Sequence, residues 1–184
     1  IGSVFGGGNG KDKYKNDNGW QDNPGANVNG PTTTWIYGGT VHEAYGASNK
    51  KGTITGTVLI DVANTNPDNC TLDLAKIVGA GKDADVNGDL IMVMGCKPGT
   101  KVPVLYAGAD NAHVNGNVEL TITSGKFGKV FGGNNAGGYI LGHIKLNIEE
   151  TGDCATPIEI DELYLGGNQA AYSQYGYYNA ETDP

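Results

Sequence analysis

The sequence predicts an all-β fold, a single-stranded parallel β-helix (solenoid) of about six coils. Three observations lead to this prediction. A six-residue word recurs along the chain, and a second word with the periodicity of a β-strand lies between its copies. In addition, no segment keeps an amphipathic helical period for more than about two turns. Self-similarity at periods of this size indicates a repeat architecture.

The first word consists of two apolar residues, two glycines and a polar tip, with Ala replacing Gly in some copies. The first glycine of each copy, or its Ala substitute, stands at positions 6, 46, 79, 107, 132 and 166, so the steps are 40, 33, 28, 25 and 34 residues. Glycine suits the corner of a coil because it enters φ > 0 without steric cost. The six copies are Val4–Asn9, Ala44–Asn49, Ile77–Lys82, Leu105–Asp110, Val130–Asn135 and Tyr164–Gln169.

The second word is a glycine followed by apolar residues at every second position, which is the pattern of a half-buried strand. If successive copies stack in parallel, every backbone donor and acceptor pairs with the coil above or below. Connections between parallel strands are nearly always right-handed, so we expect a right-handed coil. The inward columns would then read Val58/Leu90/Val118/Ile144, Ile60/Met92/Leu120/Leu146 and Val62/Met94/Ile122/Ile148.

We expect one β-helix domain over residues 1–184, and the start at Ile1 in the middle of a repeat suggests a fragment of a longer repeat protein. Residues 9–30 are polar and are interpreted as a loop inserted at a coil corner. Residues 170–184 form a tail after the last repeat.

The charge of the chain excludes several functions. The formal net charge is −8, and all 12 basic residues are Lys. Phosphate binding needs a basic face and usually Arg, so we expect no nucleic acid partner. The absence of Arg also weakens the case for a lyase acting on acidic polysaccharides. The longest aliphatic run, Leu90–Met94, is far shorter than the ~20 residues of a membrane span.

No cofactor is expected, with calcium as the one open possibility. The inserted loop is rich in oxygen ligands, namely Asp12, Asn16, Asp17, Asn18 and Asp22. It does not match an EF-hand, because placing Gly19 at the sixth position of that loop puts Tyr14 at the first. The three histidines lack the converging partners of a zinc site, so no metal ligands are assigned.

The three cysteines are expected at one corner of the stack, between the two strands of their coils. Cys70 and Cys96 belong to successive coils and could form a disulfide, because stacked strands lie about 4.8 Å apart. The odd count, with Cys154 left over, argues against a disulfide framework. A single bridge and three unpaired thiols both remain open.

One column of polar residues could carry acid–base chemistry. Aligning the coils on three apolar positions places Asp85, His113 and Tyr139 one above the other, about 5 Å apart. Lys82 and Asp110 are expected to stack in the same region. The alternative interpretation is a hydrated corner with ordinary polar contacts between coils.

Exposed aromatic residues are the candidates for ligand contact, because aromatic faces stack on sugar rings and Tyr adds a polar tip. Alternatively, the tyrosines pack the tail over an open end of the stack. The candidates are Trp20 in the inserted loop and Tyr172, Tyr175, Tyr177 and Tyr178 in the tail.

The outward face of the strands in the second word changes along the chain. Leu59 and Ile91 form a small apolar patch, whereas Glu119 and Lys145 occupy the same column in the next two coils. The patch could lie under the inserted loop or contact another chain or domain.

The Val-Phe-Gly-Gly-Gly-Asn-Gly, Val-Phe-Gly-Gly-Asn-Asn and Leu-Gly-Gly-Asn words, separated by Gly-x-Val-x-Leu-x-Ile strands, resemble those of right-handed parallel β-helix repeat proteins on the surface of gut bacteria. The resemblance covers roughly residues 1–169. It implies an adhesin-like or carbohydrate-associated protein that is secreted or at the cell surface. Its partner would be a host or bacterial surface glycan or protein, and flanking repeats could contact its ends or sides.

Two functional hypotheses follow. The first is a non-catalytic module that serves as a rigid stalk or display scaffold, with its loops carrying any carbohydrate or protein contact. The alternative is a polysaccharide-active β-helix enzyme, a lyase or hydrolase, that uses Asp85, His113 and Tyr139.

Overall fold

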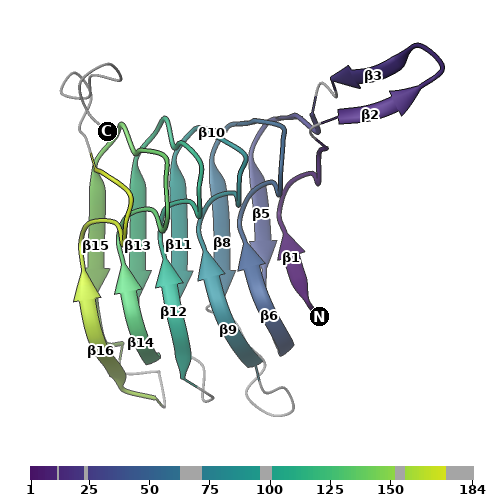
Figure 1. The fold of residues 1–184 in the computed structure, drawn as a ribbon. Coiled ribbons are helices and arrows are strands. Elements are labelled where there is room, and N and C mark those ends of the chain that lie inside the picture. The colour runs from purple at the N-terminus through teal and green to yellow at the C-terminus, as the bar shows by residue number, and fades with distance from the viewer. Residues whose placement is uncertain (12, 23–24, 63–71, 96–100, 152–155, 173–184) are drawn as a thin grey trace.

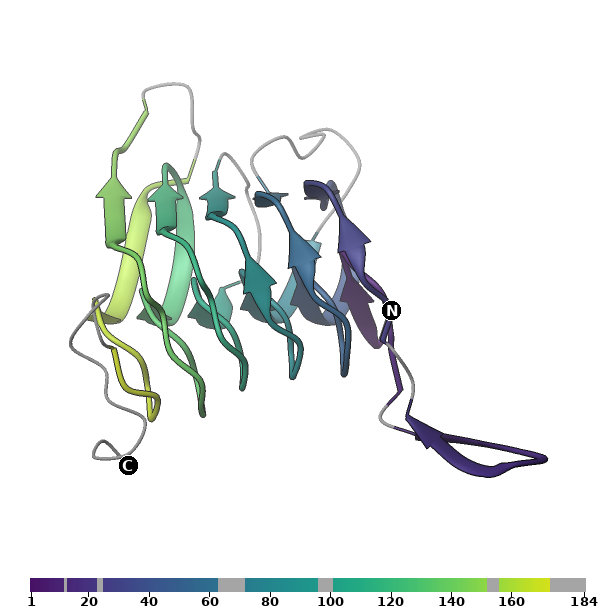
Figure 2. The ribbon, with the colours of Figure 1, turned by 90° about the horizontal axis from the view of Figure 1, so that it is seen from above.

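The computed structural model describes residues 1–172 except 12, 23–24, 63–71, 96–100 and 152–155 (Figure 1). Over these residues the fold is all-β, with parallel sheets and no closed barrel, and it is consistent with a β-solenoid. The chain runs repeatedly through the same sheets, so that strands one repeat apart in the sequence become neighbours in space (Figure 2).

Two parallel sheets carry most of the structure. The first, called the long sheet, has the order β1-β6-β9-β12-β14-β16. Its strands are β1 (Ser3–Phe5), β6 (Gly39–Tyr45), β9 (Leu72–Val78), β12 (Val102–Tyr106), β14 (Gly125–Phe131) and β16 (Ile158–Tyr164).

The second sheet has the order β15-β13-β11-β8-β5 and faces the long sheet across the core. Its strands are β5 (Thr32–Trp35), β8 (Val58–Val62), β11 (Leu90–Met94), β13 (Val118–Ile122) and β15 (Ile144–Ile148).

A narrow third sheet lies between these two along the chain. It has the order β10-β7-β4, and single bridges from Val86 to Val114 and from Val114 to Ile140 continue its line through the later repeats. Its strands are β4 (Val28–Asn29), β7 (Ile54–Thr55) and β10 (Val86–Asn87).

The register of the second sheet confirms the columns predicted from the second word. Leu90 pairs with Val58 on one side and Val118 on the other, and Val118 pairs with Ile144. The other two predicted columns follow in the same register. Apolar residues of these columns, such as Leu120, are fully buried against the long sheet. The outward column is also confirmed, since Leu59 pairs with Ile91 and Glu119 pairs with Lys145.

The second word begins with a glycine mainly because neighbouring repeats approach closely there. A positive φ angle is the lesser reason. A Cβ at Gly116 would lie 2.2 Å from the carbonyl oxygen of Gly88, and one at Gly142 would lie 2.4 Å from that of Gly116. Only two glycines of this column have positive φ, Gly30 at 147° and Gly56 at 144°. The backbones of successive coils therefore nearly touch at this corner, and a side chain does not fit.

The last copy of the first word is out of register with the sequence alignment by one residue. The alignment placed Gly166 over Gly132, but in the structure Phe131 pairs with Tyr164, so that Leu165 follows over Gly132. The last step is therefore 33 residues instead of 34. The sequence alignment matched the pair Gly166-Gly167 to Gly132-Gly133. In the structure the register follows instead from the packing of the buried Phe131 beside Tyr164. A slip by one residue would turn every side chain of the strand to the other face.

The segment expected as a loop at residues 9–30 contains regular structure. Strands β2 (Lys13–Asn16) and β3 (Gly19–Asp22) pair as an antiparallel hairpin. The hairpin projects beyond β1 at one end of the stack (Figure 1). Residues 28–29 have already rejoined the stack as β4, which pairs with β7. The hairpin turn contains Asp17 and Asn18, and the Asn18 amide donates to Asn16 Oδ1 at 2.9 Å. Turns of this kind favour Asn, Asp and Gly.

Candidate functional site

The column predicted for acid–base chemistry is assembled in the structure. The backbone amide of His113 donates to Asp85 Oδ1 at 2.8 Å. The backbone amide of Tyr139 donates to His113 Nδ1 at 3.3 Å, and the two rings are 3.8 Å apart between centroids. Three successive repeats thus bring the predicted residues together at one corner.

The hydrogen bonds that Asp85 and His113 accept in this column come from backbone amides. The Asp85 carboxylate bonds to the next coil rather than to the imidazole. Because His113 Nδ1 accepts a hydrogen bond, the neutral ring carries its proton on Nε2. Asp89 and Asn117 continue the same pattern, since their side-chain oxygens accept from the backbone amides of Asn117 and His143. Such a ladder holds neighbouring coils in register.

A cavity of about 270 Å³ opens beside this column. His113 and Tyr139 form one wall, and Gln169 with the alanines after it forms another. The hydroxyl of Tyr172 donates to the Gly142 carbonyl oxygen at 3.2 Å, and the side chain is 44% exposed. This hollow could receive a small polar group or one sugar unit.

A second polar cluster surrounds Asp110 on the outer face of the long sheet, and the sequence predicted a polar position for Asp110 but not these partners. Asp110 Oδ2 accepts from Lys76 Nζ at 2.6 Å and from the Tyr45 hydroxyl at 3.1 Å. Asp110 Oδ1 accepts from Asn135 Nδ2 at 2.6 Å. Sequence alignment places Lys82 over Asp110, and backbone bonds confirm that register, since the Asp110 amide donates to the Gly81 carbonyl. The ion-pair partner is nevertheless Lys76.

In this cluster the pKa of Asp110 is lowered, whereas the pKa values of Tyr45 and Tyr106 are raised. Burial is the largest influence on Asp110 and would raise its pKa, but the bonds from Lys76 and Asn135 outweigh it, so the pKa lies below its usual value. Burial, reinforced by the Asp110 charge, raises the pKa of Tyr45. Burial likewise raises the pKa of Tyr106. The carboxylate is therefore ionised and both phenols are neutral at physiological pH.

Aromatic rings line the same face. Phe5 stacks on Tyr45 at 4.8 Å between centroids, Tyr106 on Phe131 at 5.1 Å, and Phe131 on Tyr164 at 5.0 Å. The column is interrupted at β9, where Lys76 Nζ lies 5.5 Å from the Tyr45 ring centroid and 5.8 Å from that of Tyr106. This column of rings could have been found in the sequence, because the second residue of the first word is aromatic in most of its copies.

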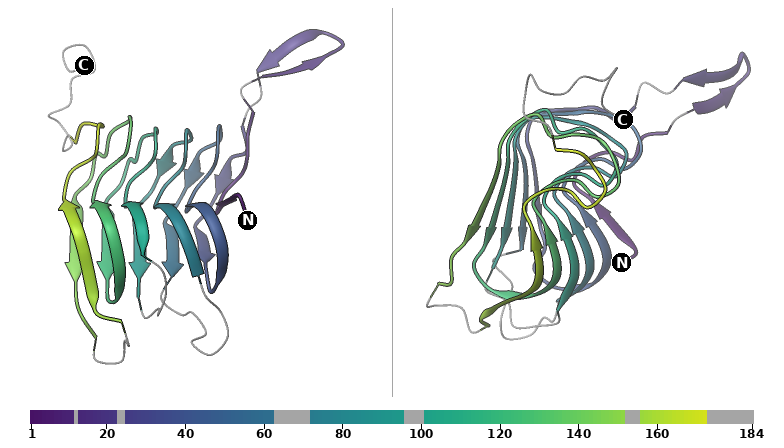
Figure 3. Two further views of the ribbon diagram at one scale, coloured as in Figure 1. Left: turned by 60° about the horizontal axis from the view of Figure 1, so that its bottom comes forward. Right: turned by 60° about the vertical axis from the view of Figure 1, so that its left-hand side comes forward.

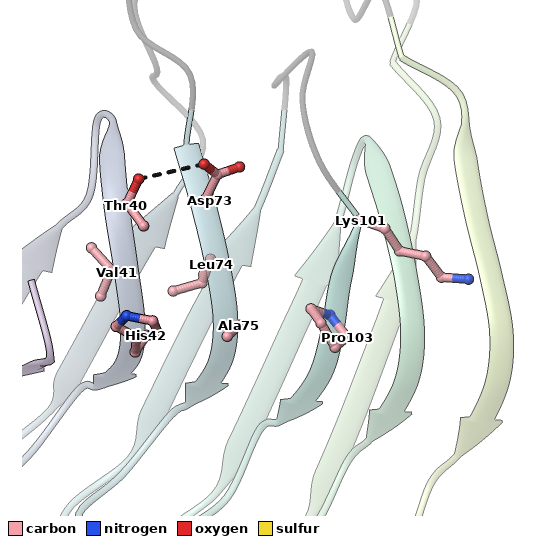
Figure 4. Close-up of a pocket in the computed structure, with 8 residues that line it drawn as sticks. All are labelled: Thr40, Val41, His42, Asp73, Leu74, Ala75, Lys101 and Pro103. Atoms are coloured by element: carbon pink, nitrogen blue, oxygen red, sulfur yellow. Dashed lines mark hydrogen bonds between the residues drawn. The ribbon is translucent and has the colours of Figure 1, made fainter.

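A shallow groove of about 260 Å³ crosses β6, β9 and β12 on the outer face of the long sheet (Figure 4). Thr40 Oγ1 donates to Asp73 Oδ2 at 3.4 Å on its rim. The Lys101 side chain extends away from the groove and pairs with Asp161. The floor is formed by small or apolar residues, and the groove presents no cluster of free polar groups.

The aromatic ligand candidates do not meet in one site. Trp20 lies on β3, 69% exposed, at the hairpin end of the stack. Tyr172 bonds to Gly142, which comes just before β15. Figure 3 shows that the yellow, C-terminal repeat lies at the end of the stack opposite the hairpin. Tyr175, Tyr177 and Tyr178 fall outside the described residues, as do Cys70, Cys96, Cys154 and Asp12.

Within the described ranges, no group of three His, Cys, Asp or Glu residues could hold a metal ion. The same part of the chain contains no long apolar helix of the kind that crosses a bilayer. Comparison with protein-family models, with curated protein sequences and with solved structures gives no match to this chain.

Proposed function

We propose that this chain is a non-catalytic module of a secreted or cell-surface protein, built as a right-handed parallel β-helix that displays loops for contact with glycans or proteins. The observation that carries the proposal is the use of polar side chains along the stack. In the column of Asp85, His113 and Tyr139, the Asp85 carboxylate and the His113 ring each accept a hydrogen bond from a backbone amide of the next repeat. These bonds favour a rigid scaffold over a reactive centre.

The fold supports the same proposal. Parallel pairing joins each repeat to its neighbours along the whole stack, which suits a stalk that holds its loops at fixed positions. Exposed aromatic side chains stand at both ends, with Trp20 at one and Tyr172 at the other. Each could stack on a sugar ring, so the two ends would bind independently.

A glycan array tests this proposal directly. The intact chain is compared with a Tyr172→Ala variant and a Trp20→Ala variant, with calcium added or chelated. We expect binding to at least one class of surface glycan and its loss in one of the two variants. Binding to no glycan under either condition would contradict a role in glycan contact.

The alternative is a polysaccharide lyase or hydrolase, and the cavity beside His113 and Tyr139 is the observation that favours it. Incubation with a panel of polysaccharides would reveal it, through new reducing ends for hydrolysis or unsaturated ends for elimination. Activity that disappears in a His113→Ala variant would replace the scaffold proposal with the enzyme.

A further inference from the structure

The lysines of this chain divide into two groups by their contacts. Six lie in the stack, and each of them forms an ion pair with an acidic residue. The other lysines of the described ranges have no ion-pair partner there, and all of them lie at the hairpin end. The paired group is Lys76, Lys82, Lys101, Lys126, Lys129 and Lys145, and the unpaired group is Lys11, Lys13, Lys15, Lys50 and Lys51.

Three of the unpaired lysines line a hollow of about 570 Å³ at the base of the hairpin. Its walls come from Asn9, Gly10, Lys11, Lys13 and Lys50. This volume lies within the range of ordinary ligand sites, about 300–1,000 Å³.

The hollow is built by the stacking of the first two copies of the first word. The Lys50 amide donates to the Asn9 carbonyl at 2.9 Å, and Asn49 Nδ2 donates to Asn9 Oδ1 at 2.7 Å. Gly10 has φ of 59°, and a Cβ there would lie 1.9 Å from the Lys51 carbonyl oxygen. Close packing of these two tips therefore places Lys50 beside the start of the hairpin.

The hairpin adds an aromatic surface to these charges. Lys15 pairs directly with Trp20 across the two strands, so both side chains stand on one face of the hairpin, together with Lys13.

We propose that the hairpin base binds an acidic polysaccharide, with the unpaired lysines contacting its carboxylates and Trp20 stacking on a sugar ring. Lysine supplies point charges without the planar fork of arginine, which suits single carboxylates distributed along a chain. A broad exposed indole suits the apolar face of a pyranose. All 12 basic residues of the chain are Lys, so the arginine fork that favours phosphate recognition is missing. This proposal rests on the proposed function, because it names the glycan that one end of the module contacts.

The test is calorimetric titration of the intact chain with hexagalacturonate and with its fully methyl-esterified form, which has the same sugars without the charge. A Lys11→Gln/Lys13→Gln/Lys50→Gln variant removes three unpaired lysines. A Lys101→Gln/Lys126→Gln/Lys145→Gln variant makes the same change in net charge at exposed, ion-paired positions. A Trp20→Ala variant tests the stacking surface.

We expect hexagalacturonate to bind the intact chain at least tenfold more tightly than the ester. The affinity should fall at least tenfold in the first triple variant, by less than twofold in the second, and with rising salt. Binding should also weaken in Trp20→Ala.

Three outcomes would overturn the proposal. These are no binding of hexagalacturonate, equal affinity for the charged and esterified forms, or equal loss in both triple variants. Tighter binding of a single-stranded hexanucleotide would instead assign a phosphate-bearing partner. The two proposals can fail separately. If hexagalacturonate does not bind but the array detects neutral glycans whose binding requires Tyr172, the scaffold proposal stands. If the chain degrades a polysaccharide, the non-catalytic scaffold proposal is wrong, whatever the result for the hairpin base.

Discussion

Asn134 connects three backbone segments at the tip of its repeat. Its side chain is 1% exposed, and Oδ1 accepts from the Ala109 amide of the preceding repeat at 2.7 Å. Nδ2 donates to the Ala112 carbonyl at 2.9 Å and to the Gly137 carbonyl at 3.1 Å. The polar residue of this word therefore replaces backbone hydrogen bonds that the irregular turn cannot make.

Replacing Asn134 by Ala should lower the free energy of unfolding by about 2–4 kcal/mol, because the buried Ala109 amide and Ala112 carbonyl and the part-buried Gly137 carbonyl lose this partner. Urea denaturation measures this difference. Asn168→Ala is the matched control, since Asn168 is exposed and its side chain donates one bond, to Asn135 Oδ1 at 3.0 Å. Equal losses in the two variants would show that Asn134 does not hold the turn.

Asp110 makes stability depend on pH. Its pKa is lowered in the folded state, so its contribution is complete above the unfolded pKa of about 4 and is lost as the pH falls through the folded pKa. Asp110→Asn should cost about 1.5–3 kcal/mol at pH 7, where Lys76 and Tyr45 lose the carboxylate charge. The two proteins should converge in stability toward pH 2.

Thermal or urea unfolding between pH 2 and pH 7 measures this convergence. Glu159→Gln serves as the control, because Glu159 forms an exposed ion pair with Lys126. A constant difference between Asp110→Asn and the parent chain across this range would contradict the assignment of the pH dependence to Asp110.

Residue-scale prediction from the sequence succeeded where position in the repeat decides the neighbour. Asp85, His113 and Tyr139 meet because stacking places equivalent residues together. The partner of Asp110 could not be predicted in the same way. Lys76 reaches it from a different position of the repeat, through a long side chain.

At the scale of the strand, the glycine column of the second word determines how closely the coils approach. Gly116→Ala should cost about 1–3 kcal/mol, because its Cβ would lie 2.2 Å from the Gly88 carbonyl oxygen and the coils would have to separate. Gly166→Ala should be nearly neutral, since nothing lies within 4 Å of a Cβ there. Urea denaturation compares the two, and a neutral Gly116→Ala would mean that the coils can separate at little cost.

The register of β8, β11, β13 and β15 in the second sheet could be predicted, because period-two burial admits a single alignment of Leu90, Val118 and their equivalents. The last strand of the long sheet could not. Its Gly166-Gly167 pair resembles the corner glycines, whereas the aromatic stacking of Tyr164 on Phe131 fixes the register. The hairpin was also missed, since Lys13–Asp22 has few apolar residues and its pairing depends on the turn.

At the scale of the whole molecule, each repeat contacts chiefly its two neighbours, so stability should vary along the stack. Strand β11 pairs on both edges, with β8 and β13, whereas β15 stands at the end of its sheet. Core residues follow the same gradient: Leu120 is fully buried, and Leu146 at the end is only half-buried. A repeat at the end therefore opens without disrupting those in the middle.

This gradient predicts the outcome of hydrogen exchange and of two matched substitutions. Amides of β11 and β13 should exchange most slowly and those of β15 and β16 faster, because opening the end of the stack breaks one interface instead of two. Leu120→Ala should cost about 2–5 kcal/mol and accelerate exchange throughout, whereas Leu146→Ala should cost about half as much and act mainly on the last repeat. Uniform exchange across all strands, or equal effects of the two substitutions, would contradict this prediction. Either result would mean that the stack unfolds as a single cooperative unit and that its end is no less stable than its middle.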